Sequence, residues 1–237
     1  MKPKELPFVR DMFDGIAPHY DFLNRLLSLR RDVYWRRNLA ACLDLQPGAW
    51  VLDVACGTAD VALEIVRQMH GKVHIAGVDF APEMLRLARP KIEARNAAAG
   101  IHLAAADAFH MPFGRVRFDA LTMAFGIRNI QDKETVLQRF LEQLKSGGRL
   151  AILELATPTS GLLGKAFLSY FNRLLPLIGR LFSKHHYAYT YLPDSVARFP
   201  AAPQFAGLLR RAGFVNVRYR KLTLGIAVLF VGDKPAA

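Results

Sequence analysis

Three aspartates stand where short apolar segments of the chain end. Asp53 lies in the apolar run 50–54, Asp79 closes the run 73–79, and Asp107 follows the run 101–106. Carboxylates accept hydrogen bonds from the hydroxyls of a ribose and attract cations, but they repel phosphate. If the three runs are parallel strands, their carboxyl ends meet at one edge of a sheet, where open α/β folds bind ligands. The spacing therefore predicts a site for a nucleoside that carries a cation and no phosphate.

The turn that follows Asp53 has the composition of a nucleotide-binding loop. It continues as Val-Ala-Cys-Gly57-Thr58-Ala-Asp, and its small residues let a ligand approach the backbone and the free N–H groups of the next helix. The dinucleotide pattern G-x-G-x-x-G is absent, and an acid before Gly57 would repel a pyrophosphate. The alternatives are an NAD site and three aspartates that only cap helices. We favour S-adenosylmethionine, whose sulfonium and amino groups are cationic, with Asp53, Gly57, Asp79 and Asp107 around it.

The elements that would position these residues alternate between strand and helix patterns. Apolar runs predict strands at 50–54, 73–79, 101–106, 118–124 and 149–155. Helical spacing predicts helices over 58–70, from Pro82 onward, over 132–145 and over 200–212. The chain closes with 214–220 and 223–231, which read as paired strands with a tight turn at 221–222. Strict alternation of this kind predicts an α/β fold with a parallel sheet covered on both faces.

Two segments interrupt the alternation without marking a second domain. The pattern of residues 1–45 predicts a helical N-terminal extension, and that of residues 157–199 predicts a lid-like insertion. We see no internal repeat and no flexible linker, and at 52% hydrophobic residues the chain can fill a core. We therefore predict a single domain over 1–237.

The chain carries a formal net charge of +12, which calls for an explanation. No acidic residue occurs between 155 and 193, where four Lys and Arg residues interrupt an apolar helical pattern. This segment fits an anionic membrane surface, or alternatively a helix pair that only covers the sheet. We see no secretory signal, no apolar stretch long enough to span a bilayer, no disulfide framework and no nucleic-acid module. We expect a cytoplasmic protein that attaches to the inner face of the cell membrane, and its oligomeric state is left open.

Several motifs occur in order along nearly the whole chain. They are Met12-Phe-Asp-Gly-Ile-Ala-Pro-His-Tyr-Asp-Phe-Leu-Asn24, Leu52-Asp-Val-Ala-Cys-Gly-Thr58, Gly77-Val-Asp79, Phe125-Gly-Ile-Arg-Asn129, Tyr191-Leu-Pro-Asp-Ser195 with Phe199-Pro200, and Gly213-Phe214 with Gly225-Ile226. With these motifs the chain resembles a known family, the ubiquinone/menaquinone biosynthesis C-methyltransferases. The resemblance implies a class I methyltransferase with a Rossmann-like seven-stranded sheet that uses S-adenosylmethionine to methylate a ring carbon of a polyprenylated quinol.

The resemblance leaves three interpretations of the function open. Demethylmenaquinol is the main expectation, and a methoxy-benzoquinol of ubiquinone biosynthesis is the first alternative. A second alternative is a non-catalytic assembly protein, because Ala59, Ala124 and Phe230 stand where the family commonly has Gly, Ser and His. We expect Phe230 on the substrate side, where it would remove a titratable group. We rank RNA methylation last, because no base-binding segment accompanies the charge.

By position, the resemblance also assigns cofactor contacts. Thr58, Asp79, Asp107 and Ala108 would contact the cofactor, the last two at the adenine. Ala124 matches a further contact and lacks the hydroxyl that is common there.

The chemistry also requires a proton acceptor and an oxyanion partner. Arg128 stays protonated, so we predict it as an electrostatic partner for a phenolate, against the alternative that it bridges backbone carbonyls. His19 is the candidate base, and Tyr20 and Asp21 are further candidates. The alternative is that His19 is only a surface residue and that Tyr20 only packs in the core. We expect no metal, because a sulfonium is already a good leaving group.

Overall fold

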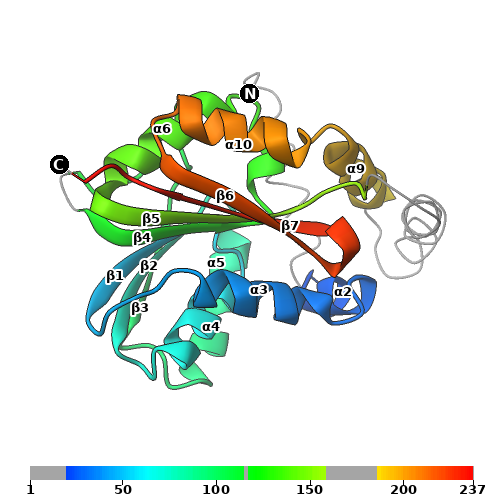
Figure 1. Cartoon of the computed structure of the whole chain (residues 1–237). Coiled ribbons are helices and arrows are strands. Elements are labelled where there is room, and N and C mark those ends of the chain that lie inside the picture. Colours follow the sequence, from blue (N-terminus) through cyan, green and yellow to red (C-terminus); the bar gives the residue numbers. More distant parts are fainter. Residues whose placement is uncertain (1–19, 115–116, 159–185, 237) are drawn as a thin grey trace.

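The computed structural model describes residues 20–114, 117–158 and 186–236, and a mixed seven-stranded sheet runs through its centre (Figure 1). The sheet order is β3-β2-β1-β4-β5-β7-β6, with β7 antiparallel to both of its neighbours. The strands are β1 (Ala49–Val54), β2 (Val73–Asp79), β3 (Ile101–Ala105), β4 (Phe118–Ala124), β5 (Leu144–Leu155), β6 (Val215–Leu222) and β7 (Ala227–Asp233).

Helices cover both faces of this sheet because neighbouring strand residues point to opposite sides. On one face, Val51 and Ile75 belong to a core with α3 (Arg31–Ala41), α4 (Asp60–Gln68) and α5 (Pro82–Glu93). On the other face, Leu52 and Ile152 belong to a core with α6 (Lys133–Gln143) and α10 (Ala202–Arg211). Figure 1 shows these two layers below and above the strands. The remaining helices, α2 (Tyr20–Leu27) and α9 (His186–Ala197), lie together at one end of the sheet (Figure 1).

The predicted α/β alternation is confirmed, with two boundary corrections. The fourth and second strands match their predicted bounds, but the helix expected over 132–145 ends at Gln143 and β5 begins at Leu144. Tertiary pairing decides this boundary, because Leu144 pairs with Phe118 and the amide of Lys234 donates to the Gly148 carbonyl at 2.8 Å.

The second correction concerns the C-terminal turn. The chain turns at Thr223–Gly225 and not at 221–222, since buried Leu222 still pairs with Ala227. Leu224 and Gly225 take positive φ values of 59° and 91°, which supply the reversal.

Phe230 occupies a different place from the one its sequence position suggested. We expected it on the substrate side, where a family His is common. It is 1% exposed, and its ring lies 4.7 Å from that of Phe205 and 6.0 Å from that of Tyr219. Because this position of β7 faces the core under α10, a histidine there would be a buried residue and not a pocket residue.

Parts of the two predicted extra segments are described. Within 1–45 the structure has α2 and α3, and within 157–199 it has α9. The basic amphipathic segment of the predicted lid lies almost wholly within 159–185, outside the described residues. Among the helices that the structure does describe, none is both long and apolar enough to cross a membrane.

Candidate cofactor and active site

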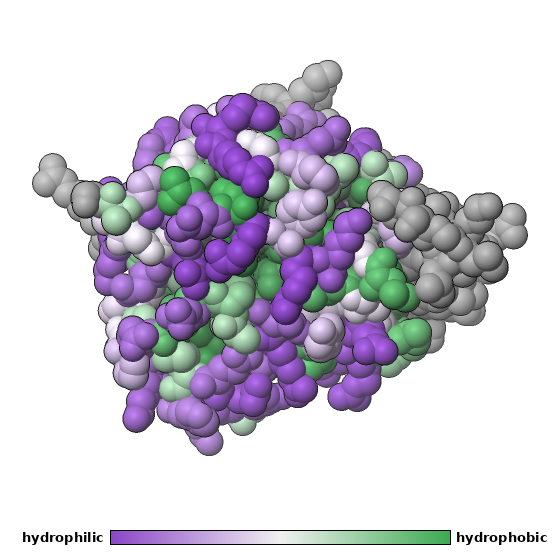
Figure 2. Space-filling view, viewed as in Figure 1, coloured by the Kyte–Doolittle hydropathy of each residue, from purple (hydrophilic) through white to green (hydrophobic). Residues whose placement is uncertain are grey.

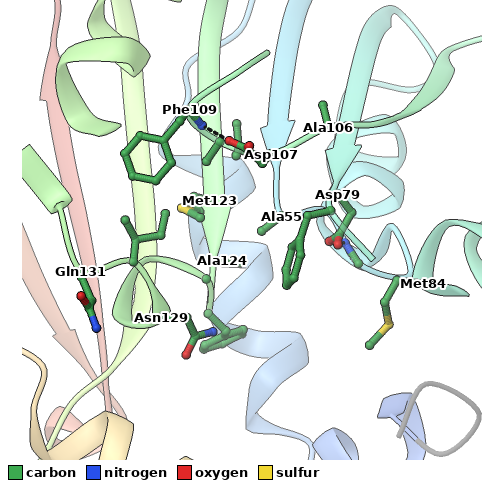
Figure 3. A pocket seen from close by; sticks show the side chains of 17 residues that line it. Ala55, Asp79, Met84, Ala106, Asp107, Phe109, Met123, Ala124, Asn129 and Gln131 are labelled. Atoms are coloured by element: carbon green, nitrogen blue, oxygen red, sulfur yellow. Dashed lines mark hydrogen bonds between the residues drawn. The ribbon is translucent and has the colours of Figure 1, made fainter. Parts of the chain in front are cut away.

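A pocket opens at the carboxyl ends of β1, β2, β3 and β4. Figure 3 shows Asp79 and Met84 on one side of it and Asn129 and Gln131 on the other. Five of the predicted cofactor residues line it, namely Gly57, Asp79, Asp107, Ala108 and Ala124. The other lining residues are mostly apolar: Val54, Ala55, Phe80, Met84, Ala106, Phe109, Met123, Phe125, Gly126, Asn129, Ile130 and Gln131.

Asp79 fastens the loop between β1 and α4. Its Oδ2 accepts the Gly57 amide at 2.8 Å and its Oδ1 accepts the Ala81 amide at 2.9 Å. Gly57 has a φ of +54°, and a Cβ placed there would meet nothing within 4 Å. Each carboxylate oxygen can accept more than one hydrogen bond, so Asp79 can hold the loop and still receive ribose hydroxyls.

The loop carries unusual backbone strain. Ala55 and Ala59 have φ values of 53° and 64°, in the left-handed region that costs about 1–2 kcal/mol for a residue with a Cβ. Phe125, across the pocket, has a φ of 59°. Next to it, Gly126 is closely packed, because a Cβ would lie 2.7 Å from Met123 Cε and 3.0 Å from Ala55 Cβ and would force a neighbour to shift. Strain of this kind concentrates at functional sites, which supports the placement of the site here.

Asp107 caps the turn after β3. Its Oδ1 accepts the amides of Phe109 at 2.6 Å and His110 at 3.1 Å, and its Oδ2 lies 3.0 Å from His110 Nδ1. Partial burial would raise the pKa of Asp107, but the hydrogen bonds from His110 and Phe109 lower it overall. The carboxylate is therefore ionised at neutral pH, with Ala108 beside it in the pocket wall.

Asp53 lies beneath the loop and is not among the lining residues. It is 1% exposed, and its Oδ1 accepts the Thr122 hydroxyl at 2.7 Å. Its buried Oδ2 has no hydrogen-bond partner within the described part of the chain. Burial raises the pKa of Asp53 from 3.8 to about 7, and the nearby charge of Asp79 adds to the rise.

This raised pKa predicts a pH-dependent stability. A carboxyl with a higher pKa in the folded chain binds its proton more tightly there, so the free energy of unfolding falls as pH rises from about 4 to about 7. Asp53 should account for a loss of about 2–3 kcal/mol between pH 5 and pH 8. Urea unfolding at both pH values should show that Asp53→Asn removes this loss.

Asp119 provides the control for that measurement. Although partial burial would raise its pKa, a hydrogen bond from Lys145 lowers it overall, so Asp119→Asn should leave the loss between the two pH values in place. A loss that is the same in Asp53→Asn and in the unmodified chain would contradict the assignment.

Thr58 faces away from the pocket, toward α2. Its hydroxyl donates to Asp21 Oδ1 at 2.7 Å, and Lys91 Nζ lies 2.6 Å from Asp21 Oδ2 and 3.1 Å from Thr58 Oγ1. Lys91 also pairs with Asp60. This network joins α2 and α5 to the cofactor loop, so its described side chains support the loop from outside. Direct contact between Thr58 and the cofactor stays a prediction.

Arg128 is held in a buried network. Its guanidinium is 7% exposed and lies 2.9 Å from Oε1 of Glu154, a fully buried carboxylate, and it also donates to the Phe125 carbonyl. Its Nε donates to Ser195 Oγ at 3.3 Å, and its amide donates to Glu154 Oε2 at 3.1 Å. This arrangement fits the alternative that Arg128 bridges groups after the fourth strand. Its role toward a phenolate stays a prediction.

The described part of the structure does not include the side chains of two further predicted residues. His19 lies outside the described residues, and Tyr20 begins α2 but its side chain is not among those described. Residues that the sequence reasoning missed include Asn129 and Gln131 in the pocket wall and Lys91 beneath the loop. Asn129 belongs to the Phe125–Asn129 motif, which was the available signal for it.

Comparison with known proteins identifies the family. A family model described as the ubiE/COQ5 methyltransferase family matches residues 1–234. The chain belongs to this family. It is therefore a methyltransferase that uses S-adenosylmethionine, on the seven-stranded class I methyltransferase fold.

Individual proteins agree with this assignment. The chain is 48% identical over 226 residues to the ubiquinone/menaquinone biosynthesis C-methyltransferase UbiE of Geobacter sulfurreducens, covering 95% of this chain and 88% of that protein. It is 46% identical to the demethylmenaquinone methyltransferase of Deinococcus radiodurans, covering 95% and 92% of the two chains. The crystal structure of the [4+2]-cyclase SpnF has the same fold, with a TM-score of 0.72, 16% identity and coverage of 97% and 96%.

The residues of the pocket fit S-adenosylmethionine. Asp79 and Asp107 supply carboxylates at the ends of two adjacent strands, and the space beside Gly57 leaves the backbone accessible. The buried Oδ2 of Asp53 lies beneath the same loop without a hydrogen-bond partner in the described part of the chain. A cationic ligand above it would favour the ionised form of this carboxyl. Asp79 would hold the ribose, and Asp107 with Ala108 would hold the adenine.

Proposed function

We propose that this protein methylates a ring carbon of a polyprenylated quinol, with demethylmenaquinol as its main substrate. The family match over 1–234 carries the proposal, together with relatives named for ubiquinone/menaquinone and demethylmenaquinone methylation. The apolar wall of the pocket supports it, because Phe80, Phe109 and Phe125 suit an aromatic ring. A methoxy-benzoquinol is the alternative substrate.

The chain's own residues would prepare this reaction. When bound, S-adenosylmethionine supplies an electrophilic methyl group on a sulfonium. Asp79 and Asp107 fix the ligand's orientation, and the aromatic wall excludes water from the reacting atoms. The quinol hydroxyl beside the reacting carbon must lose its proton, and we propose His19 as the group that receives it. We propose Tyr20 as a hydrogen-bond donor that stabilises the resulting oxyanion. We propose Arg128 as a positioning residue that fixes the 125–131 segment through Glu154.

A complementation experiment tests the proposal. We expect the chain to restore menaquinone in a bacterial strain that lacks its own demethylmenaquinone-methylating enzyme. A quinone extract that retains only demethylmenaquinone, despite soluble expressed protein, would overturn the proposal. The unmethylated methoxy-benzoquinone of the same strain is followed over the same period. If it disappears, the chain also methylates the alternative substrate, and if it accumulates, the chain does not.

We also propose that the protein works at the inner face of the cell membrane as a peripheral protein. The support is the acid-free segment 155–193, its four cations and the membrane-soluble tail of the proposed substrate. In a flotation assay the protein should rise with vesicles that contain anionic phospholipid. Recovery of all protein in the soluble fraction, with and without anionic lipid, would refute this part of the proposal.

A further inference from the structure

A second cavity, of about 260 Å³, lies apart from the cofactor pocket among α2, α3, α4 and the end of α5. Six arginines and two acids belong to its lining, which gives the lining a formal charge of +4. Figure 2 shows mostly hydrophilic side chains over the α3 and α4 side of the molecule. The lining residues are Arg25, Arg30, Val33, Arg36, Arg37, Asp60, Leu63, Glu64, Arg67 and Arg95.

The two acids of this cavity are already paired. Arg36 Nη1 lies 3.4 Å from Asp60 and also pairs with Asp32, and Arg67 Nη2 lies 2.6 Å from Glu64. Both carboxylates are therefore fully engaged by cations that belong to the fold.

The remaining four arginines form no close ion pair among the described residues, although the charge of Arg25 still acts on Asp60 and that of Arg37 on Glu64. Within the described part of the chain, no ion pair joins Arg25, Arg30, Arg37 or Arg95 to a carboxylate. Six guanidinium groups against two carboxylates leave the lining with a net positive charge, which attracts an anion. Their planar donor groups match the oxygens of a phosphate, which they bind in pairs of hydrogen bonds.

The backbone that presents Arg30 is strained. Leu29 and Arg30 are consecutive residues with φ values of 51° and 61°, although neither is a glycine. This left-handed pair forms the connection between α2 and α3 and brings Arg30 to the cavity.

We propose that this cavity binds a phosphate-bearing anion, at a site separate from the cofactor pocket. Two sources of that chemistry fit the cavity: the headgroup of an anionic phospholipid, or a free phosphate compound. The proposal does not depend on the identity of the quinol.

Calorimetry and vesicle binding on the full chain test the site. One arm titrates inorganic phosphate at constant ionic strength, and the other uses phosphatidylcholine vesicles with and without phosphatidylglycerol. Replacing Arg37 and Arg95 together by alanine should weaken binding by about 100-fold, since the charge-assisted hydrogen bond lost with each arginine accounts for about 10-fold. The control is Arg139→Ala, which removes an exposed arginine of α6 that pairs with Glu142 outside the cavity.

A second pair of variants separates charge from folding. Leu29→Gly and Arg30→Gly both relieve a left-handed residue, so neither should unfold the chain. Only Arg30→Gly should weaken anion binding. Binding of phosphate in solution identifies a free-anion site, and binding only to phosphatidylglycerol vesicles identifies a headgroup site. Either result supports the proposal if the cavity variants lose that binding. Absence of binding in both arms, or equal binding by the cavity variants and the Arg139→Ala control, would overturn it.

Discussion

Replacement of Arg128 by methionine is expected to lower the free energy of unfolding by about 3–5 kcal/mol. The reason is the environment of Glu154, which is 0% exposed and has the Arg128 guanidinium at 2.9 Å. Without Arg128, that carboxylate must either remain charged inside the protein or take up a proton. Both are costly at neutral pH, because burial disfavours the charge and the solution disfavours the proton. Urea unfolding of the variant and the unmodified chain gives the difference.

A double variant separates loss of the pair from loss of packing. Adding Glu154→Gln to Arg128→Met removes the uncompensated charge, so it should restore about half or more of the lost stability. Arg139→Met is the matched control, because its ion pair with Glu142 is exposed and should contribute less than about 1 kcal/mol. If Arg128→Met costs no more than this control, the ion pair does not hold the 125–131 segment in place.

The Asp79→Ala variant should bind S-adenosylmethionine about 100-fold or more weakly, which corresponds to about 3 kcal/mol. Asp79 is the acid that closes β2 in the pocket wall, and its two oxygens also hold the amides of Gly57 and Ala81. The substitution would remove the acceptor that we propose for the ribose, and it would also loosen the loop. Calorimetry with the purified chain measures the change.

Two further variants keep this result interpretable. Asp79→Asn retains the shape and one acceptor oxygen, so it should remain folded and still lose most of the affinity. Glu83→Ala removes the same charge from an exposed position in the first turn of α5, where Glu83 pairs with Arg86. Its affinity should stay within about 3-fold of the original, since an exposed pair contributes little. Equal losses for Asp79→Asn and Glu83→Ala would mean that general charge, and not the ribose contact, governs binding.

Much of the fold follows from local patterns in the chain. The apolar runs that became β2 and β4 have the period and flanking residues of buried strands, and Pro82 marks the start of α5. The convergence of Asp79 and Asp107 in one pocket followed from strand order alone, because carboxyl ends of parallel strands share an edge.

Features that depend on pairing between distant segments could not be predicted from local patterns in the sequence. The start of β5 depends on contact with Lys234, and the side of the sheet that Phe230 faces depends on the register of β7. The Thr58–Asp21 bond joins residues 37 positions apart, and no local pattern announces it. For the same reason, the sequence could not show that the fold brings Glu154 of β5 to the Arg128 guanidinium.

Methyl transfer in a purified system tests the central claim most directly. The full chain, labelled S-adenosylmethionine and demethylmenaquinol are incubated with vesicles, and the quinones are then extracted and separated. We predict label in menaquinone with the unmodified chain and little or none with Asp79→Asn. A folded chain that binds S-adenosylmethionine but leaves both demethylmenaquinol and the methoxy-benzoquinol unlabelled would contradict the assignment of quinol methylation.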